Sequence, residues 1–365
     1  MRVAIEVSAL KTGHKFRGVG FYIKRLVQAL QKVDKKNKYV LIENSKTPNL
    51  QKSKFDLVHY PYFDLFFLTL PIKKLAPTVV TIHDVIPLVF PEKYPKGIRG
   101  WFKFQIQKFS LKSVKTVITD SQNSKRDISK YLNFQREKIF VAPLAPGEEF
   151  KKLVIGHWSL VIKEKYQLPD TFVLYVGDVN WNKNVLGLIK AFKKLQSFQT
   201  HAAGKTFGDA RPKLQLVMVG KAFEDKNLPE TKAILRLIEE LNLNNRIKIL
   251  GFVPTKDLVG IYNLASVYCQ PSFYEGFCLP VLEAMACGTP VVCSSKSSLP
   301  EIIGDAAILI DPNDYSSLAQ GIKKVLEEKG LAKKLQVKGL TQARQFTWRK
   351  IAIKTIKVYR RVAEK

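Results

Sequence analysis

The sequence predicts an α/β protein made of two doubly wound, Rossmann-like domains. Two observations lead to this fold class. Short runs of Val, Ile and Leu alternate with amphipathic, helix-like segments along almost the whole chain. These runs show little apolar/polar alternation, which is typical of parallel strands buried on both faces of a sheet. A chain of 365 residues is long enough for two such domains.

The predicted strands form two series separated by a change in pattern. The first series lies at residues 3–7, 39–43, 56–60, 78–83, 116–120 and 139–143. The second lies at residues 172–177, 214–220, 247–253, 267–271, 290–294 and 306–310. Helical patterns between the strands include residues 20–33, 124–132, 185–195, 230–241, 280–286 and 315–327. We expect the polar segment 196–212 to be a surface loop or an insertion.

The domain boundary is expected between Pro146 and Asp170, where the turn-rich run APGEE interrupts the pattern. We therefore assign residues 1–168 to a first domain and residues 169–345 to a second. Residues 346–365 form a closing helical segment.

The composition is strongly basic, with 60 Lys and Arg against 31 Asp and Glu and a formal net charge of +29. Such a charge favours anionic partners, namely phosphates, nucleic acid or acidic lipid, without choosing among them. We expect a cytoplasmic protein, because the first residues lack a secretory apolar region and the apolar run near residues 60–70 is too short to span a bilayer.

The four cysteines lie at positions 269, 278, 287 and 293 and form no C-x-x-C pair. We expect them to be small buried apolar residues in a reducing compartment. A zinc site is not expected, because no histidine is near them in the sequence.

Candidate ligand-binding residues follow the predicted strands of the first domain. In open parallel sheets, ligands bind beyond the carboxyl ends of strands, often at helix N-termini. Gly18 and Gly20 allow the backbone to approach a ligand there, although they also fit an ordinary helix-capping turn. His83 ends an apolar strand and suits a hydrogen bond to a sugar hydroxyl or a proton transfer. The alternative is a histidine that only orients its loop with Asp84.

The second domain repeats this arrangement with cations. Gly177 ends a strand and precedes Lys183, and Lys221 follows the next strand. A lysine in such a position suits a diphosphate. For Lys183 the alternative is a solvated side chain beside a helix cap at Asn184. The exposed main chain at Val253 is expected to pair with the edge of a nucleobase.

The run EGFCLPVLE places Glu275 and Glu283 eight residues apart. Each carboxylate can accept hydrogen bonds from the vicinal hydroxyls of a ribose or hexose. Backbone N–H groups between them face a predicted helix start and suit phosphate or sugar oxygens; they belong to Gly276, Phe277, Cys278 and Leu279. The alternative, a surface glutamate plus a helix-start glutamate, explains Glu283 alone. Carboxylates, N–H groups and lysines together indicate a nucleotide-sugar site.

At these residues the chain resembles the retaining glycosyltransferases of family 4. The resemblance rests on the glutamates at 275 and 283, on GFVP at 251–254, on SLPEIIGDAA at 298–307 and on FTWR at 346–349. It covers nearly the whole chain. It implies the GT-B fold, in which two doubly wound domains face a central cleft and a C-terminal helix crosses back to the first domain.

The resemblance also implies roles for individual residues. Glu283 would bind the ribose hydroxyls, and Glu275 with the N–H groups after it would hold the donor sugar. Lys183, together with Gly18, would face the diphosphate. His83 would lie near the reaction centre. We therefore take His83, Lys183 and Glu275 as the candidate catalytic residues.

Two positions depart from the family pattern. The chain has Asn182-Lys183-Asn184 where the family often has Arg-Lys-Asn, so one phosphate-binding cation is missing. We expect Lys221 or Arg17 to compensate. Cys278 stands where the family often has glycine, and a positive φ there would strain the backbone.

The family implies transfer with retention of configuration, with a nucleoside diphosphate as leaving group. Lys183 and helix N–H groups would stabilise the charge that develops on the phosphate. No D-x-D motif occurs, so we expect no metal and no other cofactor to be required. A nucleophilic Glu275 stays open, although we favour a positioning role. The run IHDVIPL at 82–88 most resembles mannosyltransferases, which indicates GDP-mannose.

The acceptor is expected to be lipid-linked or a polysaccharide of the cell envelope. In residues 95–117, Trp101, Phe102 and Phe109 interleave with lysines, so this segment is either core or a surface that touches anionic lipid. With the net charge, it predicts a peripheral protein at the inner face of the plasma membrane. The alternatives are a nucleotide-sugar hydrolase or epimerase, a silent membrane scaffold, and a nucleic-acid-binding protein. Nucleic acid is not expected, because no recognised motif for it occurs.

Overall fold

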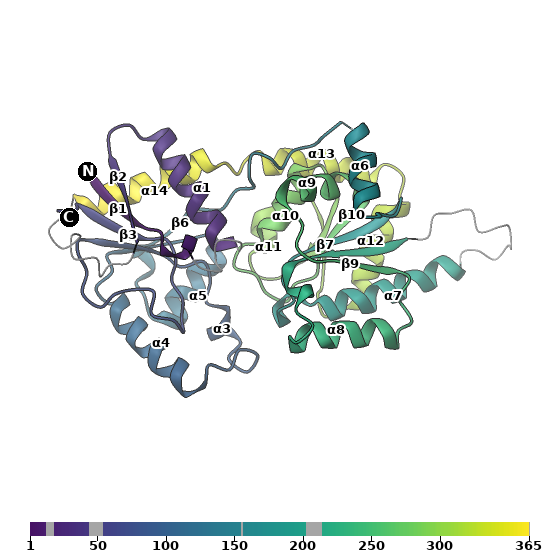
Figure 1. Cartoon of the computed structure of the whole chain (residues 1–365), viewed down its shortest axis with the longest axis horizontal. Coiled ribbons are helices and arrows are strands. Elements are labelled where there is room, and N and C mark those ends of the chain that lie inside the picture. Colours follow the sequence, from purple (N-terminus) through teal and green to yellow (C-terminus); the bar gives the residue numbers. More distant parts are fainter. Residues whose placement is uncertain (12–17, 44–53, 155, 202–213, 365) are drawn as a thin grey trace. The chain divides into compact units, whose positions relative to one another are not determined.

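The computed structural model describes residues 1–11, 18–43, 54–154, 156–201 and 214–364. The chain forms two compact units (Figure 1). The first comprises Met1–Ala145 together with Phe346–Lys365, and the second comprises Pro146–Gln345. Each unit contains a six-stranded sheet, which confirms the predicted two-domain α/β class.

The sheet of the first unit has the order β2-β1-β3-β4-β5-β6, and all of its neighbouring strands are parallel. Its strands are β1 (Arg2–Glu6), β2 (Lys38–Ile42), β3 (Leu57–Tyr60), β4 (Thr78–Thr81), β5 (Thr116–Thr119) and β6 (Ile139–Val141). Every residue of the inner strands β3, β4 and β5 is buried. Burial on both faces explains why their sequences lack a polar alternation.

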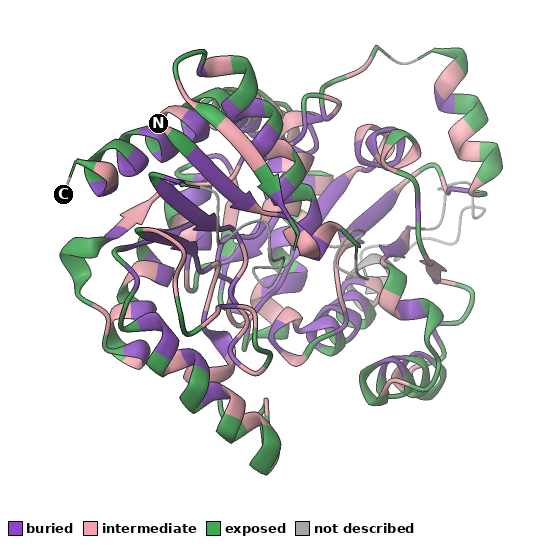
Figure 2. Cartoon of the chain, turned by 60° about the vertical axis from the view of Figure 1, so that its left-hand side comes forward, coloured by how far each residue is buried: buried purple, intermediate pink, exposed green. Residues whose placement is uncertain are grey.

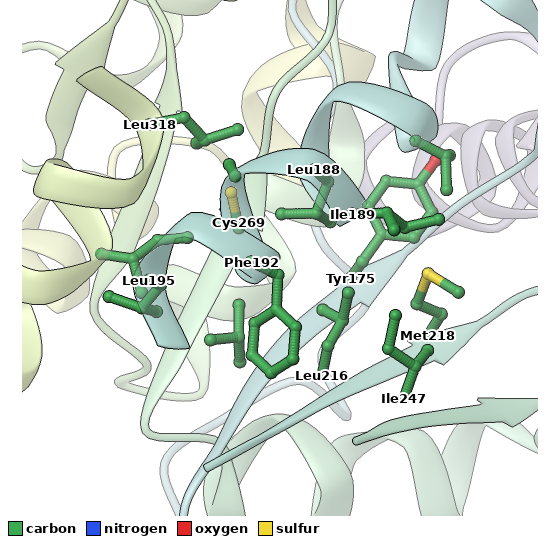
Figure 3. Packing of buried hydrophobic residues seen from close by; sticks show 14 of the residues in the cluster. Tyr175, Leu188, Ile189, Phe192, Leu195, Leu216, Met218, Ile247, Cys269 and Leu318 are labelled. Atoms are coloured by element: carbon green, nitrogen blue, oxygen red, sulfur yellow. The ribbon is translucent and has the colours of Figure 1, made fainter. Parts of the chain in front are cut away.

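The sheet of the second unit has the order β12-β11-β10-β7-β8-β9 and is also parallel throughout. Its strands are β7 (Phe172–Val176), β8 (Gln215–Val219), β9 (Ile247–Leu250), β10 (Val267–Gln270), β11 (Val291–Ser294) and β12 (Ile308–Ile310). Figure 3 shows part of its core, where Leu188 and Phe192 of a helix pack on Tyr175 and Leu216 of the central strands.

Helices connect the strands of both units. In the first unit they are α1 (Gly18–Val33), α3 (Ile86–Val89), α4 (Gly97–Leu111), α5 (Gln122–Leu132) and α14 (Trp348–Ala363). In the second they are α6 (His157–Lys165), α7 (Val185–His201), α8 (Pro229–Glu240), α9 (Thr255–Leu264), α10 (Leu279–Ala286), α11 (Leu299–Ile303), α12 (Tyr315–Glu327) and α13 (Leu331–Ala343). Short 3-10 turns include η1 (Ser8–Lys11), η3 (Arg136–Lys138), η4 (Trp181–Lys183) and η5 (Lys221–Glu224). Buried residues line the strands and inner helix faces, and exposed residues the outer faces (Figure 2).

The structure differs from the predicted boundaries in two places. Helix α7 continues to His201, so residues 196–201 are helix and not loop, while residues 202–212 lie outside the described residues. Residues 146–168 belong to the second unit and not to the first. The reason is that α6 packs on α9, where Gly260 leaves just enough room for Ile162 and Trp158.

The closing helix α14 belongs to the first unit. Its Tyr359 is fully buried, and the Tyr359 hydroxyl lies 2.7 Å from His59 Nδ1 in β3. At the other end of the helix, the Trp348 ring is 6.2 Å from the ring of Tyr22 in α1. The last residues of the chain thus complete a core that begins with the first strand.

Candidate functional site

The second sheet reverses its strand order between β7 and β10. The chain passes from β7 to β8 on one side and from β10 to β11 on the other, although β7 and β10 are themselves paired. Open α/β sheets bind ligands at such a switch point, beyond the carboxyl ends of the strands. Lys183 follows β7 and Glu275 follows β10, so the topology places both residues at this point.

Lys183 and Glu275 form a buried ion pair. Lys183 Nζ lies 2.8 Å from Glu275 Oε1 and 2.9 Å from Oε2. Glu275 Oε1 also accepts hydrogen bonds from Ser272 Oγ at 2.7 Å and from Gln270 Nε2 at 3.2 Å. Burial acts to lower the pKa of Lys183, but the nearby Glu275 carboxylate more than offsets this, and the pKa is raised. A protonated ammonium group therefore stands at the strand ends.

The two asparagines beside Lys183 hold its loop in place. Asn182 Nδ2 donates to the Tyr274 carbonyl at 2.8 Å. Asn184 has a left-handed backbone (φ 54°) and donates to the carbonyls of Pro271 and Pro312 at 3.0 and 2.8 Å. Asn182 therefore connects the loop after β7 to the loop after β10. Its side chain is neutral, so it supplies no cation to the site. The alternative of a solvated Lys183 does not hold, because only 20% of its side chain is exposed.

The start of α10 has the expected strained backbone. Cys278 precedes the helix with a φ of 79°. This value lies in the left-handed region that favours glycine, so a cysteine there strains the backbone. The bend is fixed by Ser297 Oγ, which accepts from the Glu275 N–H at 2.9 Å, and by Ser298 Oγ, which donates to the Glu275 carbonyl at 3.0 Å. This loop, which carries Gly276, leads into the N-terminus of α10 at Leu279, where a helix has unpaired N–H groups. The helix start was expected from the sequence, and the positive φ meets the condition under which strain at Cys278 was expected.

Glu283 lies inside α10 and has a different partner from Glu275. Its Oε2 accepts a hydrogen bond from the Tyr262 hydroxyl at 3.1 Å. Burial raises the pKa of Glu283 to about 7, the negative charge of Glu149 adds to the increase, and the Tyr262 hydrogen bond opposes it. Glu283 is thus a carboxylate whose pKa lies near neutral pH.

The glycine at the end of β8 is required by space. A Cβ on Gly220 would lie 2.0 Å from the Gly177 carbonyl oxygen, so no side chain fits there. The Gly220 N–H in turn lies 3.2 Å from the Gly251 carbonyl, beyond β9. Lys221 is exposed at the start of η5, while the Val253 side chain is buried. The three strand ends therefore come together as the sequence predicted.

In the first unit the sequence analysis missed a partner of His83. His83 Nδ1 lies 2.7 Å from Asp120 Oδ2, which follows β5. Asp84, which the alternative interpretation paired with this histidine, accepts the Ile86 N–H at 3.1 Å. Burial acts to lower the pKa of His83, but the charge and hydrogen bond of Asp120 dominate with a contribution from Asp84, so that this pKa is raised. Because His83 and Asp120 both follow neighbouring parallel strands, their positions were a signal that could have identified the pair.

A buried chain of polar groups supports this histidine. The Tyr359 hydroxyl contacts His59 Nδ1, and His59 Nε2 lies 2.8 Å from Thr81 Oγ1. The Thr81 hydroxyl is 3.0 Å from the Tyr22 hydroxyl, and the Tyr22 ring lies edge-on to His83 at 4.7 Å. Burial lowers the pKa of His59 to about 3, so this histidine is neutral.

Gly18 is the first residue of α1 and is exposed, and a Cβ there would meet no atom within 4 Å. Nothing in the described part of the chain therefore requires a glycine at this position. The preceding residues of the glycine-containing loop, including Arg17, lie outside the described residues.

The comparisons with known proteins agree with this arrangement. The family model described as glycosyl transferases group 1 matches residues 160–341, and that described as Glycosyltransferase Family 4 matches residues 12–145. The chain belongs to the group 1 glycosyltransferases. The resemblance inferred from the paired glutamates is thereby confirmed.

Named relatives of this glycosyltransferase include mannosyltransferases. The O-antigen chain mannosyltransferase B of Escherichia coli is 32% identical over 289 residues, which are 79% of this chain and 71% of that protein. The serotype-specific mannosyltransferase WbdA of Escherichia coli is 28% identical over 290 residues, but the chain covers only 34% of its length.

Solved structures of other proteins share the fold of this glycosyltransferase. A glycosyltransferase from Rickettsia africae superposes with a TM-score of 0.69 at 21% identity, over 99% of this chain and 98% of that one. HepE from Anabaena, solved with UDP and glucose, superposes with a TM-score of 0.72 at 17% identity, over 100% and 98%. Together with the two parallel sheets, these likenesses confirm the two-domain GT-B fold.

The described residues hold neither a candidate metal cluster nor a candidate membrane span. Among the described residues, no group of three or more His, Cys, Asp or Glu side chains is arranged to hold a metal ion. Within the same ranges, no helix combines the length and the apolar character needed to cross a membrane. The four cysteines are free and buried, as predicted.

Proposed function

We propose that this glycosyltransferase transfers mannose from GDP-mannose to a lipid-linked or polysaccharide acceptor of the cell envelope, with retention of configuration. The observation that carries the proposal is the buried Lys183–Glu275 pair at the switch point of the second sheet. The names of the related O-antigen mannosyltransferases and the IHDVIPL run support mannose as the sugar.

In this proposal the second unit holds the donor. Lys183 and Lys221 bind the diphosphate beside Gly177, and Glu275 binds the sugar hydroxyls with the N–H groups at 276–279. Glu283 binds the ribose, and the main chain at Val253 contacts the base. The UDP and glucose in the HepE structure support a nucleotide-sugar as the class of donor. For Gly18 and His83 we retain the roles implied by the family, a diphosphate contact and a group near the reaction centre.

The proposed chemistry depends on the positive charge of Lys183, which is fixed in position before the donor binds. When the bond between the anomeric carbon and the diphosphate oxygen breaks, negative charge develops on the leaving group. A protonated Lys183 and the helix N–H groups stabilise that charge, so we propose that no metal ion is needed. Glu275 already accepts bonds from Lys183, Ser272 and Gln270. A carboxylate so engaged is a poor nucleophile, which supports a positioning role.

A thermal-shift screen tests the donor. We expect GDP-mannose to raise the melting temperature more than UDP-, dTDP- or ADP-sugars, because a ligand at 100 times its Kd stabilises the native state by about 2.7 kcal/mol. No shift with any sugar nucleotide at millimolar concentration would overturn the proposal. The anomeric configuration of the product, read by NMR, tests retention.

A variant pair tests the site itself. We expect Lys183→Gln to lower the transfer rate by about 10²–10³-fold, as for other preorganised donors of charge stabilisation. Lys163→Gln is the matched control, because Lys163 pairs with Asp170 at the surface of the same unit. Donor turnover at an equal rate with and without acceptor would instead indicate a hydrolase.

We further propose that the enzyme works in the cytoplasm, at the inner face of the plasma membrane. The net charge of +29 supports attraction to an anionic surface. A lipid-linked acceptor would place its substrate there.

A further inference from the structure

Helix α4 directs polar side chains inward. Gln107 is fully buried, and its Nε2 donates to the Asp64 carbonyl at 2.9 Å and to Thr69 Oγ1 at 2.8 Å. Ser110 is also buried and donates to the Pro71 carbonyl at 2.6 Å. Hydrogen bonds thus attach the helix to the segment 64–71. Its buried Phe104 and Leu111 belong to the same apolar cluster as residues of that segment.

The opposite face of α4 is apolar and exposed. The exposed fraction of its large side chains runs from 39% for Ile106 to 78% for Ile98. Exposed apolar side chains also stand at positions 67 and 68 of the neighbouring segment and at position 72 directly after it. The full set is Phe67, Leu68, Ile72, Ile98, Trp101, Phe102, Ile106 and Phe109. Soluble monomers rarely expose so many large apolar side chains together, and those that do use them for binding.

The part of this surface that lies on and around α4 carries only positive charge. Between residues 93 and 119 there is no Asp or Glu, and the basic residues are Lys93, Lys96, Arg99, Lys103, Lys108, Lys112 and Lys115. Two lysines lie directly over exposed rings, Lys103 Nζ at 4.9 Å from the Phe67 ring centre and Lys112 Nζ at 5.9 Å from that of Phe109. The first of these contacts links α4 to the segment 64–71, so that both belong to one surface.

We propose that this aromatic–basic surface, made of the apolar and basic residues just named, docks on an anionic lipid bilayer. Basic residues near an anionic membrane are attracted to its surface, and aromatic rings favour the headgroup region. The helix would lie in the interface with its apolar face in the acyl boundary. This docking surface deepens the proposed location at the inner face of the plasma membrane, and it does not depend on the identity of the donor.

The charges and side chains disfavour two other occupants. A second copy of the chain, meeting this surface face to face, would set its basic residues against an identical basic set. Nucleic acid would match the charge, and its bases can stack on aromatic rings. It provides no apolar environment, however, for aliphatic side chains such as Leu68, Ile72 and Ile98. Insertion into lipid buries those side chains as well.

Vesicle co-sedimentation tests the apolar half of the surface. We expect the protein to bind vesicles of phosphatidylcholine mixed with an equal amount of phosphatidylglycerol, and to bind pure phosphatidylcholine far more weakly. The triple variant Ile98→Ser, Phe102→Ser, Phe109→Ser should lose binding by at least about tenfold. Its matched control replaces exposed apolar residues of the second unit, Leu160→Ser, Val161→Ser and Leu235→Ser, and should bind normally.

A second variant pair tests the charge. Arg99→Gln, Lys112→Gln and Lys115→Gln together should weaken vesicle binding by about tenfold or more. The control Lys226→Gln, Lys232→Gln and Lys329→Gln removes the same net charge from exposed positions elsewhere and should have little effect. Equal losses in both would show that only the overall charge matters and would overturn the proposal.

Trp101 provides a local probe, because 44% of it is exposed at this surface. We expect brominated lipid to quench tryptophan fluorescence in the native protein and much less in Trp101→Phe.

Three outcomes would each contradict the proposal. They are equal binding to neutral and anionic vesicles, dimerisation through this face, and preferential binding of single-stranded nucleic acid. Circular dichroism confirms that the variants fold. The variants should still show the thermal shift with the sugar nucleotide. A loss of vesicle binding with that shift intact would test membrane docking separately from donor binding.

Discussion

Lys183 Nζ contacts both carboxylate oxygens of Glu275, at 2.8 and 2.9 Å, and thereby joins the loops that follow β7 and β10. The pair is buried, with 20% and 5% of the two side chains exposed. A carboxylate so close to the ammonium group keeps it protonated at any physiological pH, as the raised pKa of Lys183 indicates. A donor diphosphate would therefore meet a cation whose charge and position are fixed before binding.

The first prediction concerns the stability of the protein when the buried charge of Lys183 loses its partner Glu275. Glu275→Gln should lower the free energy of unfolding by about 3–5 kcal/mol, as measured in urea. The double variant Lys183→Met, Glu275→Gln should recover much of that loss and remain inactive. Asp170→Asn, which breaks the surface pair with Lys163, should cost less than about 1 kcal/mol. A Glu275→Gln protein as stable as the native one would contradict the structural role of the pair.

The second prediction concerns the pH dependence of stability through Glu283. Its pKa is raised from 4.5 to about 7 in the folded protein, so the folded state holds the proton more tightly than the unfolded state. The resulting stability is fully present below about pH 4.5 and is lost as the pH rises through about 7, by roughly 3 kcal/mol. Glu283→Gln should remove this slope from unfolding curves measured between pH 5 and 8, a window set by the pKa values above. A slope unchanged by the substitution would assign the titration to another group.

The same titration bears on donor binding. If ribose hydroxyls donate to the carboxylate form, the affinity for the donor should increase as the pH rises through about 7, with release of a proton. Calorimetry in buffers of different ionisation enthalpy measures that proton. The pH-dependent part should disappear in Glu283→Gln.

The twelve strands of the described ranges were predictable because each is a parallel strand whose apolar run is readable locally. The positions of Glu275 and Lys183 were predictable too, because parallel topology brings strand ends to one edge. The contact between His59 and Tyr359 was not, since 300 residues separate them and only the packing of α14 brings them together. The inward Gln107 was also hidden, because its partners lie in an irregular segment without periodicity.

The third prediction separates backbone strain from side-chain packing at Cys278. Its φ of 79° costs about 1–2 kcal/mol for any residue but glycine. Cys278→Gly should therefore be more stable than Cys278→Ala by about 1 kcal/mol, although it removes more of the side chain. The order should reverse at Cys293, which is buried within the regular strand β11. Urea unfolding of the four variants gives the comparison, and the same order at both sites would exclude strain as the cause.

The fourth prediction concerns Asp120 as a positioning residue for His83. Asp120→Asn removes the charge that holds the raised pKa of His83, so this pKa should fall, as followed by NMR of the imidazole. Asp84→Asn is the matched control: Asp84 makes a smaller contribution to the same pKa, so its change should be smaller.

The effect on catalysis distinguishes positioning from a purely structural role. If His83 acts near the reaction centre, Asp120→Asn should lower kcat about 10²-fold or more, the contribution typical of a positioned acid or base, and change the KM for the donor little. His83→Gln should produce a similar loss, and adding Asp120→Asn to it should cost almost nothing further, because both act through one imidazole. Additive losses in the double variant, or a change confined to unfolding free energy, would show that Asp120 acts on the fold and not through His83.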